Sequence, residues 1–444
     1  MNARPEGAMP KIATRFLDSF LPLRNWNLRV YLSGQAISLI GTWMQVTAQA
    51  WVVWSLTHST AALGVVAMLG TLPILLLGPW TGVWADTLDR RRLLIVSQTS
   101  AMVLAITLAL LVQTGVIQVW HVYVLATLLG IVTALDMPTQ QAFIGDLSGM
   151  EQLRQAVVIN NMLFQVSRMI GPALAGLVVA RLGAALAFWL NGASFLAVIA
   201  SLIIVRAAQV RRTGAADLSG FSEAVQFIRQ NPRAQDLIVF TVIVTFFGIS
   251  VMNILPAVAS QALHGSADVL GLLMGASGAG ALTGVLLVVP AVQQVRRTGL
   301  VVGAAAIWTG LWLVVFSAST RLPFSALAIF VGSMAFPVVL TTTMSTLQIM
   351  APPDMRARLM SALLMVSFGA QPLAALMVGY SAQVLGALSA VRANGLLMAA
   401  GAAALLALRP ALRSWEVHSE THGEVEHRQD TREFQLDGAQ TVEV

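Results

Sequence analysis

The chain contains no cysteine and very few charged residues. Without cysteine it can form neither disulfide bonds nor thiolate metal sites. Asp, Glu, Lys and Arg together make up only 10% of the 444 residues, whereas a soluble globular domain is typically about 25% charged. With 57% hydrophobic residues, the composition argues against a water-soluble enzyme.

Charged residues are absent from long stretches of the chain. Residues 30–85 and 93–135 contain no Asp, Glu, Lys or Arg. Because a helix needs about 20 apolar residues to cross the hydrocarbon core of a bilayer, each stretch has room for two spans. The sequence therefore predicts an all-α integral membrane protein. Twelve transmembrane helices are expected, at residues 30–55, 60–84, 93–114, 119–141, 155–180, 184–205, 236–258, 268–290, 299–319, 323–346, 359–386 and 388–409.

The positions of lysine and arginine predict how these spans are oriented. Of the 26 Lys and Arg residues, 22 fall in segments on one side of the predicted membrane and three on the other. Since short cytoplasmic loops are enriched in Lys and Arg, the richer side is predicted to be cytoplasmic, with both termini on it. The net charge of +6 then reflects membrane topology, and no nucleic-acid partner is expected.

The longest internal polar segment, residues 206–235, lies half-way along the chain. Its apolar residues between Phe221 and Ile228 have the spacing of an amphipathic helix on a membrane surface. Two six-helix halves are a common transporter architecture, with the substrate site near the midplane between them. We predict a cytoplasmic N-terminal segment (1–29), an N-terminal six-helix bundle (30–205), a cytoplasmic linker with an amphipathic helix (206–235), a C-terminal six-helix bundle (236–409) and a disordered acidic cytoplasmic tail (410–444).

The loop after the second predicted span has an acid at a helix end followed by three arginines, in the sequence GVWADTLDRRR. Its spacing resembles the signature loop of the major facilitator superfamily, Gly-x-x-(Ala/Ser)-Asp-(Arg/Lys)-x-Gly-Arg-(Arg/Lys). Thr87 stands where that pattern usually has a basic residue, and Asp89 where it has glycine. By this resemblance we expect the loop to act in gating. Its candidate residues are Gly82, Asp86, Asp89, Arg90 and Arg91.

Further motifs resemble one group within that superfamily. They are Gly41-Thr-Trp43-Met-Gln45, Ala48-Gln49-x-Trp51, Asp136-x-Pro138-x-x-Gln141-Ala-Phe143, Arg168-x-x-Gly171-Pro172 and Arg356-Ala-Arg358-x-Met360-Ser361. The combination resembles the drug:proton antiporter-type exporters, the group that includes the enterobactin exporter and macrolide efflux proteins. The resemblance runs from residue 24 to residue 408. It implies export of amphipathic compounds or siderophores, driven by the proton gradient.

Two charged residues lie well inside predicted spans, away from the span ends, where each costs on the order of 3 kcal/mol or more. Asp136, in the fourth span, is the only carboxylate that the prediction places inside a span. It is expected either to carry protons or to act as a latch. We favour the latch, because the resemblance implies that the signature-loop arginine pairs with an acid at this end of the fourth span. Arg168, near the middle of the fifth span, is expected either to contact an anionic substrate or to pair with Asp136.

Uncharged polar residues within the spans are candidates for the wall of a substrate cavity or for hydrogen bonds between helices. Gln45 and Gln49 lie four residues apart on one helix face near Trp51, which suits a cavity for amphipathic ligands. Gly171 and Pro172 resemble part of a fifth-span motif associated with antiporters. The full set of cavity candidates is Gln45, Gln49, Arg168, Asn191, Asn253 and Gln371.

The sequence thus predicts a secondary active transporter, and not an enzyme, in the inner or plasma membrane of a bacterium. We expect export of an amphipathic small molecule, such as a drug, a macrolide or a siderophore-like compound, by alternating access and proton antiport. Ala126 stands where many proton-coupled exporters of the superfamily carry arginine. A facilitated uniporter or an importer of a small metabolite is therefore kept as an alternative, as are an integral-membrane enzyme and a scaffold.

The expected partners are the small-molecule substrate, protons and the lipid bilayer. No cofactor and no metal site is expected. The sequence does not specify an oligomeric state, and a monomer is the working expectation.

Overall fold

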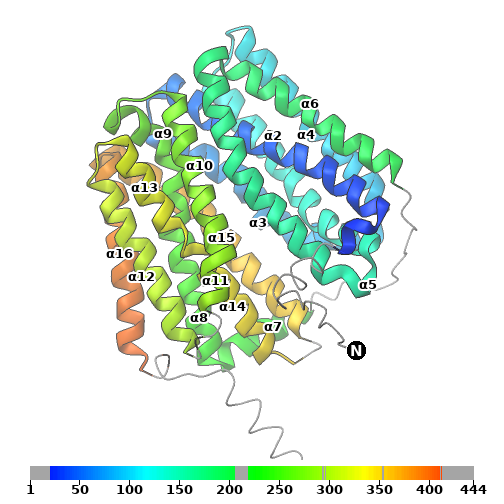
Figure 1. The fold of residues 1–444 in the computed structure, drawn as a ribbon, viewed down its shortest axis with the longest axis vertical. Coiled ribbons are helices and arrows are strands. Elements are labelled where there is room, and N and C mark those ends of the chain that lie inside the picture. The colour runs from blue at the N-terminus through cyan, green and yellow to red at the C-terminus, as the bar shows by residue number, and fades with distance from the viewer. Residues whose placement is uncertain are drawn as a thin grey trace, which may run out of the picture.

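The chain folds into two groups of helices, which lie next to each other in Figure 1. The computed structural model describes residues 21–205, 219–292, 295, 297–352, 355–410 and 412. A few side chains within helices, that of Asp86 among them, are also outside the described part. Most of the predicted N-terminal segment (1–29) and nearly all of the predicted tail (410–444) lie outside the described residues.

The first half consists of five long helices that follow a short 3-10 turn, η1 (Leu21–Arg24). Asn25 begins the first helix, because its side-chain oxygen accepts hydrogen bonds from the N–H groups of Asn27 (3.0 Å) and Leu28 (3.4 Å). Such N–H groups have no partner within a helix. The helices are α2 (Trp26–Thr57), α3 (Thr60–Thr87), α4 (Arg90–Gln113), α5 (Val119–Leu182) and α6 (Ala184–Ile204).

Helix α5 contains two membrane spans joined by a sharp bend and no loop. Gly149 at the bend has φ 69° and ψ 167°, a conformation that glycine adopts far more easily than residues with a Cβ. The fourth span therefore runs over Val119–Gly149 and the fifth over Glu151–Leu182. The predicted ends at 141 and 155 were wrong, and Asp136 lies further from the end of its span than predicted.

The second half is less regular, because several of its spans contain π-helical or 3-10 segments. Such departures are tolerated in membranes where neighbouring groups satisfy the backbone. The elements are α7 (Ser219–Gln230), α8 (Pro232–Ile243), η2 (Val244–Gly248), η3 (Ile249–Ile254), α9 (Leu255–Ala257), η4 (Val258–Ala262), α10 (Ala267–Thr283), η5 (Gly284–Val288), α11 (Val289–Val292), α12 (Thr298–Ser317), α13 (Leu322–Ser333), α14 (Phe336–Met350), α15 (Arg356–Leu385) and α16 (Ala387–Leu408).

The break between α13 and α14 shows how neighbouring side chains satisfy the backbone. The indole Nε1 of Trp308 on α12 donates to the carbonyl oxygen of Val331 (3.1 Å), and the hydroxyl of Thr309 donates to that of Gly332 (3.3 Å). Carbonyl groups in the last turn of a helix lack partners within the helix. Helix α12 therefore stabilises an interruption in the middle of the tenth predicted span.

Eleven segments of the described residues are long and apolar enough to cross a membrane. Helix α2 has 32 residues but is not among them, and its sequence contains several polar side chains, including Gln35, Gln45 and Gln49. The all-α membrane fold is thus observed. A twelfth crossing and the cytoplasmic location of the termini stay predictions.

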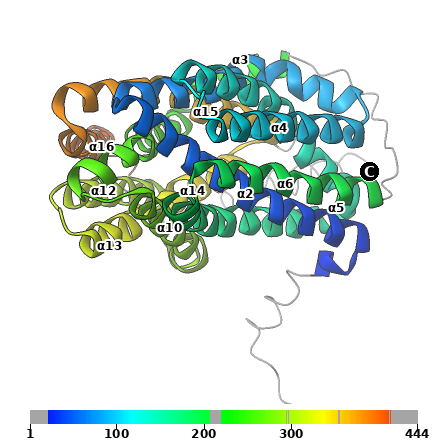
Figure 2. The ribbon, with the colours of Figure 1, turned by 90° about the horizontal axis from the view of Figure 1, so that it is seen from above.

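Among the described residues, the two halves share a hydrophobic core at one end of the bundle and have separate cores at the other. At the end that carries the turns at His58 and Gly183, here called the Arg-poor end, one cluster includes Leu63 of the first half and Leu270 of the second. At the opposite end, here called the Arg-rich end because it carries Arg90, each half has a separate cluster. Figures 1 and 2 show the two halves from two directions. The halves are therefore packed together at the Arg-poor end and divided at the Arg-rich end.

The predicted amphipathic segment contains α7, which lies at the Arg-rich end of the second half (Figure 1). Ala224 is buried, and Phe227 packs against the apolar cluster of that half. The carboxylate of Glu223 accepts a hydrogen bond from Arg358 of α15. Helix α7 is thus bound to the second half. The linker was predicted to extend to residue 235, but α8 already begins at Pro232.

Candidate functional site

Glycines allow the halves to approach closely at the Arg-poor end. Where α10 crosses α5, a Cβ on Gly271 would lie 2.5 Å from the carbonyl oxygen of Pro172 and 2.7 Å from the Cα of Gly176. Where α3 crosses α15, a Cβ on Gly64 would lie 2.5 Å from the carbonyl oxygen of Ala375. Small residues at such positions let helices pack backbone against backbone in a membrane. These two crossings join the halves.

Gln383 of α15 adds hydrogen bonds to the second crossing. Its Oε1 accepts from the backbone N–H of Thr60 (3.0 Å) and from the hydroxyl of Ser59 (3.1 Å). The hydroxyl of Thr60 donates to the carbonyl oxygen of Gly379 (2.9 Å). The unpaired N–H groups at the start of α3 are therefore satisfied partly by the other half of the molecule.

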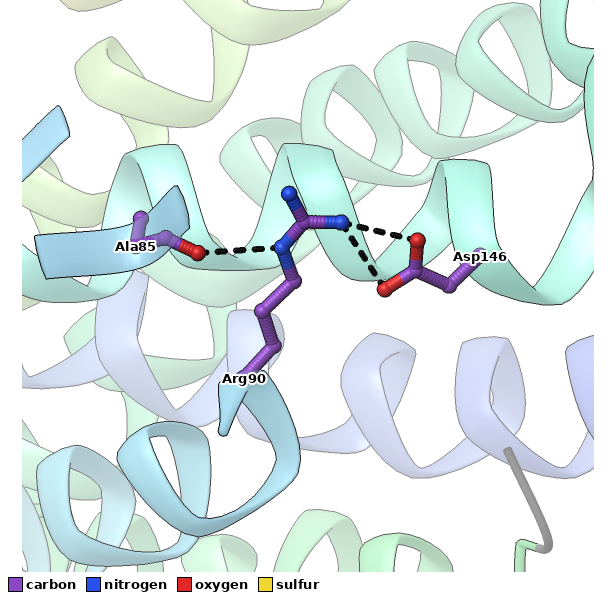
Figure 3. Close-up of polar contacts among 3 residues, drawn as sticks. All are labelled: Ala85, Arg90 and Asp146. Carbon is purple, nitrogen blue, oxygen red and sulfur yellow. Dashed lines mark hydrogen bonds and ion pairs between the residues drawn. The ribbon is translucent and has the colours of Figure 1, made fainter. Parts of the chain in front are cut away.

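At the Arg-rich end, Arg90 joins three helices of the first half (Figure 3). Its Nε donates to the carbonyl oxygen of Ala85 in α3 (3.0 Å), and its Nη1 donates to both carboxylate oxygens of Asp146 in α5 (2.8 and 3.0 Å). The two charged side chains are only 10% and 16% exposed, so water screens the pair little. In this conformation the signature loop clamps helices within one half.

The residues next to Arg90 fix the same loop. Asp89 caps α4, since its side chain accepts a hydrogen bond from the backbone N–H of Arg92 (3.1 Å). Arg91 donates to the carbonyl oxygens of Leu202 and Ile203 at the end of α6 (both 2.6 Å). A cation is favourable at a helix C-terminus. The loop therefore also holds the end of α6.

For two other residues of the predicted gating loop, the described part of the structure gives nothing that bears on gating. A Cβ on Gly82 would meet nothing within 4 Å. The side chain of Asp86 lies outside the described part of the structure. Their part in gating stays a prediction.

Asp136 accepts three hydrogen bonds deep in the first half. Its Oδ1 accepts from the hydroxyl of Ser97 and from the amide of Gln98 (2.9 Å) on α4, and its Oδ2 accepts from the amide of Gln140. The Oε1 of Gln140 in turn accepts from Gln35 of α2 (2.9 Å). The carboxylate therefore lies at the centre of a network that joins α2, α4 and α5.

These contacts correct two expectations about Asp136. Asp146 and Asp268 also lie in candidate spans, so Asp136 is not the only carboxylate there. The arginine of the signature loop pairs with Asp146, so the latch predicted for Asp136 lacks its arginine in this structure. The reason is the extension of the fourth span to Gly149, which places Asp146, and not Asp136, near the loop.

Two adjacent cavities lie between the halves. The one with the larger total empty space, about 470 Å³ with the adjoining open solvent included, is here called the larger and is lined by Arg168 of α5 and by residues of the second half. The smaller, of about 290 Å³, is lined by polar residues that include Thr71, Asn253 and Gln371. Ile249 belongs to the wall of both. Three of the predicted cavity residues, Arg168, Asn253 and Gln371, therefore do line a cavity.

The other predicted cavity residues lie elsewhere. Asn191 donates to the Oε1 of Gln45 (2.6 Å), and the two residues are 1% and 5% exposed. This pair joins α6 to α2, which is the alternative role that the sequence left open. Gln49 is half-buried and lines neither of these two cavities.

The fifth-span motif contributes to packing. A Cβ on Gly171 would lie 2.5 Å from the Cβ of Trp43 and 2.8 Å from the carbonyl oxygen of Ile40, so α5 and α2 touch at this point. The carbonyl oxygen of Pro172 faces Gly271 at the crossing of the two halves. Gly171 and Pro172 thus position α5 between the first half and the second.

Sequence reasoning missed Asp146 and most of the apolar cavity wall, which includes Met252, Trp312 and Phe336. A signal for Asp146 was present in the sequence, because it is the one Asp or Glu between Asp136 and Glu151, just beyond the predicted end of the fourth span. No comparable signal marks the wall residues, since 57% of the chain is hydrophobic.

We expect Arg90→Ala to destabilise the protein. It removes the cation from a shielded ion pair and leaves Asp146 unpaired, which typically costs about 3 kcal/mol or more. Scanning fluorimetry of the tryptophans should show a lower unfolding temperature in detergent. Arg92→Ala is the matched control, since its side chain is 86% exposed and exposed ion pairs contribute about 0–1 kcal/mol. Equal unfolding temperatures for the two variants would show that the clamp does not stabilise the fold.

The profile of the transmembrane secretion effector family, which is of the major facilitator type, matches residues 17–438. The chain belongs to this family. Major facilitators of this kind are transporters and not enzymes, and the chain is a multi-pass protein of the bacterial plasma membrane.

Several bacterial transporters are similar to this secretion effector family member. The Staphyloferrin A transporter of Staphylococcus aureus is 27% identical over 55% of this chain and 62% of its own length. The multidrug efflux pump Tap of Mycolicibacterium fortuitum is 31% identical over 42% of this chain and 46% of its own length. Macrolide efflux protein A of Streptococcus pyogenes is 30% identical over 40% and 44%. The match spans less than two thirds of each of these relatives.

Solved structures share the fold at low identity. A peptide transporter, POT, superposes with a TM-score of 0.71 at 13% identity over 87% of this chain and 94% of its own. A bacterial homologue of the human lysosomal transporter Spinster, in an inward-facing and occupied conformation, gives 0.68 at 14% identity over 88% and 97%. These structures support the major facilitator fold.

Proposed function

We propose that the chain exports an amphipathic small molecule by alternating access, in exchange for protons. The observation that carries the proposal is the packing of the halves, which share a core at the Arg-poor end and have separate cores at the Arg-rich end. Adjacent apolar and polar cavities lie between them. A substrate site between two rocking halves is the common plan of such transporters. The efflux names of several relatives support the direction of transport.

We further propose twelve spans, with α2 as the first and the Arg-rich end in the cytoplasm. Helix α2 packs against α5 and α6, and its 32 residues correspond to a length of about 48 Å. The enrichment of arginine at one end supports the orientation. The predicted six-helix bundles then correspond to α2–α6 and α8–α16, in a protein proposed to act as a monomer.

The hydrogen-bonded carboxylate of Asp136 is the proposed proton carrier. Ionisable groups inside membrane spans are characteristic of proton pathways. Ala126, which is 4% exposed, supplies no charge where many proton-coupled exporters have arginine. Facilitated transport without protons is therefore the second candidate function.

The proposal is tested in inverted membrane vesicles that carry an imposed proton gradient and a pH-sensitive dye. Drugs, macrolides and catecholate siderophores are added in turn, with vesicles that lack the protein as control. We expect one of these compounds to dissipate the gradient only when the protein is present. If a labelled compound equilibrates across the vesicles while the gradient is unaffected by every compound, antiport is wrong and facilitated transport replaces it.

A further inference from the structure

The larger cavity contains a charged group that the proposed transport cycle leaves unexplained. Arg168 lies near the middle of the fifth span, Glu151–Leu182. The contact recorded for its side chain is with the ring of Trp43, whose centroid lies 5.7 Å from the Cζ. Within the part of the chain that the structure describes, no carboxylate forms an ion pair with Arg168. Ionisable residues at such depth usually have a partner or bind a substrate.

Arg168 reaches the cavity from the other half of the molecule. The other described residues of the wall belong to the second half, between Gly248 and Phe336. Helices α5 and α10 touch at this position, because a Cβ on Gly278 would lie 2.7 Å from the carbonyl oxygen of Arg168. The first half therefore supplies the charge and the second half supplies the wall, so an occupant would contact both.

The wall combines apolar surface with a few hydroxyl groups. Met252, Trp312 and Phe336 are among its large apolar residues. The hydroxyls of Ser277 and Ser333, also in the wall, lie 2.9 Å apart. Among the described residues, Arg168 is the one that brings a charge to the wall of either cavity. The site therefore offers a single positive charge beside a surface suited to an apolar body.

The smaller cavity adds hydrogen-bonding side chains to this site. It shares Ile249 with the larger cavity and carries the amides of Asn253 and Gln371 and the hydroxyl of Thr71. Thr71 lies in α3 of the first half. A ligand that fills both cavities would therefore meet a cation and an apolar wall in one and hydrogen-bonding groups in the other.

We infer that the two cavities bind the transported molecule as an amphipathic organic anion, with a carboxylate or similar acid on Arg168 and an apolar body against Trp312 and Phe336. This inference deepens the proposed transport function and rests on it. A guanidinium binds a carboxylate with two parallel charge-assisted hydrogen bonds. A cationic compound would bring a second positive charge into a site of low dielectric constant, where like charges repel strongly.

The test compares three probes that share one aromatic body and differ in charge: 9-anthracenecarboxylate, 9-anthracenemethanol and 9-(aminomethyl)anthracene. Binding to the full chain in nanodiscs is measured by energy transfer from tryptophan, with empty nanodiscs subtracted. We expect the carboxylate to bind at least about tenfold more tightly than the alcohol, as for a hydrogen bond to a charged group, and the amine to bind most weakly. Equal binding of the three probes would overturn the inference.

Three variants test whether Arg168 causes the preference for the carboxylate probe. Arg168→Gln is expected to abolish the carboxylate preference. Arg168→Lys is expected to keep part of it, because lysine retains the positive charge but lacks the planar guanidinium group that binds a carboxylate with two hydrogen bonds. Arg181→Gln, which removes an exposed arginine from the end of the same helix, is expected to keep the full preference. A preference that survives in Arg168→Gln would place the anion elsewhere and overturn the assignment. If Arg168→Gln does not fold, the wild-type comparison and Arg168→Lys decide.

The binding assay needs neither a gradient nor net transport, so it separates the two proposals. A carboxylate preference that depends on Arg168, together with a proton gradient unaffected by substrates, supports the anion site and contradicts antiport. Gradient dissipation by substrates without any carboxylate preference supports antiport and contradicts the anion site.

Discussion

Replacing Gly271 by alanine is expected to separate the halves at the Arg-poor end and to abolish most transport. The added Cβ would meet the carbonyl oxygen of Pro172 at 2.5 Å and the Cα of Gly176 at 2.7 Å. These are backbone atoms, so no side chain can rotate away. Overpacking of this kind costs about 1–3 kcal/mol, which corresponds to a shift of about 5- to 150-fold in the balance between two conformations. In the proposed alternating-access cycle, transport requires the closed arrangement once in each cycle.

The separation can be measured directly, because the natural chain contains no cysteine. Thr60→Cys places one thiol at a position that is 4% exposed in the packed Arg-poor end. A membrane-impermeant maleimide should label it faster when Gly271→Ala is also present. Gly78→Ala is the matched control, since a Cβ on Gly78 would meet nothing within 4 Å. Unchanged labelling and transport in Gly271→Ala would show that this crossing does not control closure.

Asp136→Asn is expected to eliminate proton-driven export while leaving substrate exchange in the absence of a gradient. Asparagine has nearly the same shape as a protonated aspartate but cannot release a proton. It also presents one acceptor oxygen in place of two, so Ser97, Gln98 and Gln140 cannot all keep their present bonds. The conformational balance between the two halves should therefore shift as well. Export and exchange are measured on the same reconstituted vesicles with a labelled substrate.

The control for this variant is Asp268→Asn, which alters a carboxylate bonded to Ser266 at the Arg-poor end. That variant should retain proton-driven export. Loss of both export and exchange in Asp136→Asn would assign Asp136 a structural role. Full export in Asp136→Asn would exclude both the carrier and the latch.

Much of the fold was predictable because the membrane imposes simple rules. Long stretches without charge, such as residues 30–85, have to be helical where they cross lipid. The bend at Gly149 was not predictable, because a glycine allows a positive φ without requiring it. One unrecognised bend moved the end of the fourth span, and the partner of Arg90 was misassigned for that reason.

The sequence pointed to the polar residues of the candidate site, because placing a polar side chain inside a membrane span is energetically costly. Arg168, Asn253 and Gln371 line cavities, because polar groups inside a span need a partner or a cavity. That these cavities bind the substrate stays a prediction. Gln45 and Asn191 have the same chemistry but bond to each other (2.6 Å), because α2 and α6 pack closely there. Sequence shows that a polar side chain needs a partner, but only packing shows which partner it has.

The attachment of α7 to the second half has a consequence for the covalent connection between the halves. Because α7 packs on the second half, the segment that joins the two halves runs from Ile204 to Ser219 and not over the full polar segment 206–235. Even so, a chain of this length can extend to about 50 Å. A contour of that length sets no tight limit on how far Ile204 and Ser219 can separate. In the proposed alternating-access cycle, the tilt is then limited by the glycine crossings and not by the covalent connection, and α7 moves together with the second half.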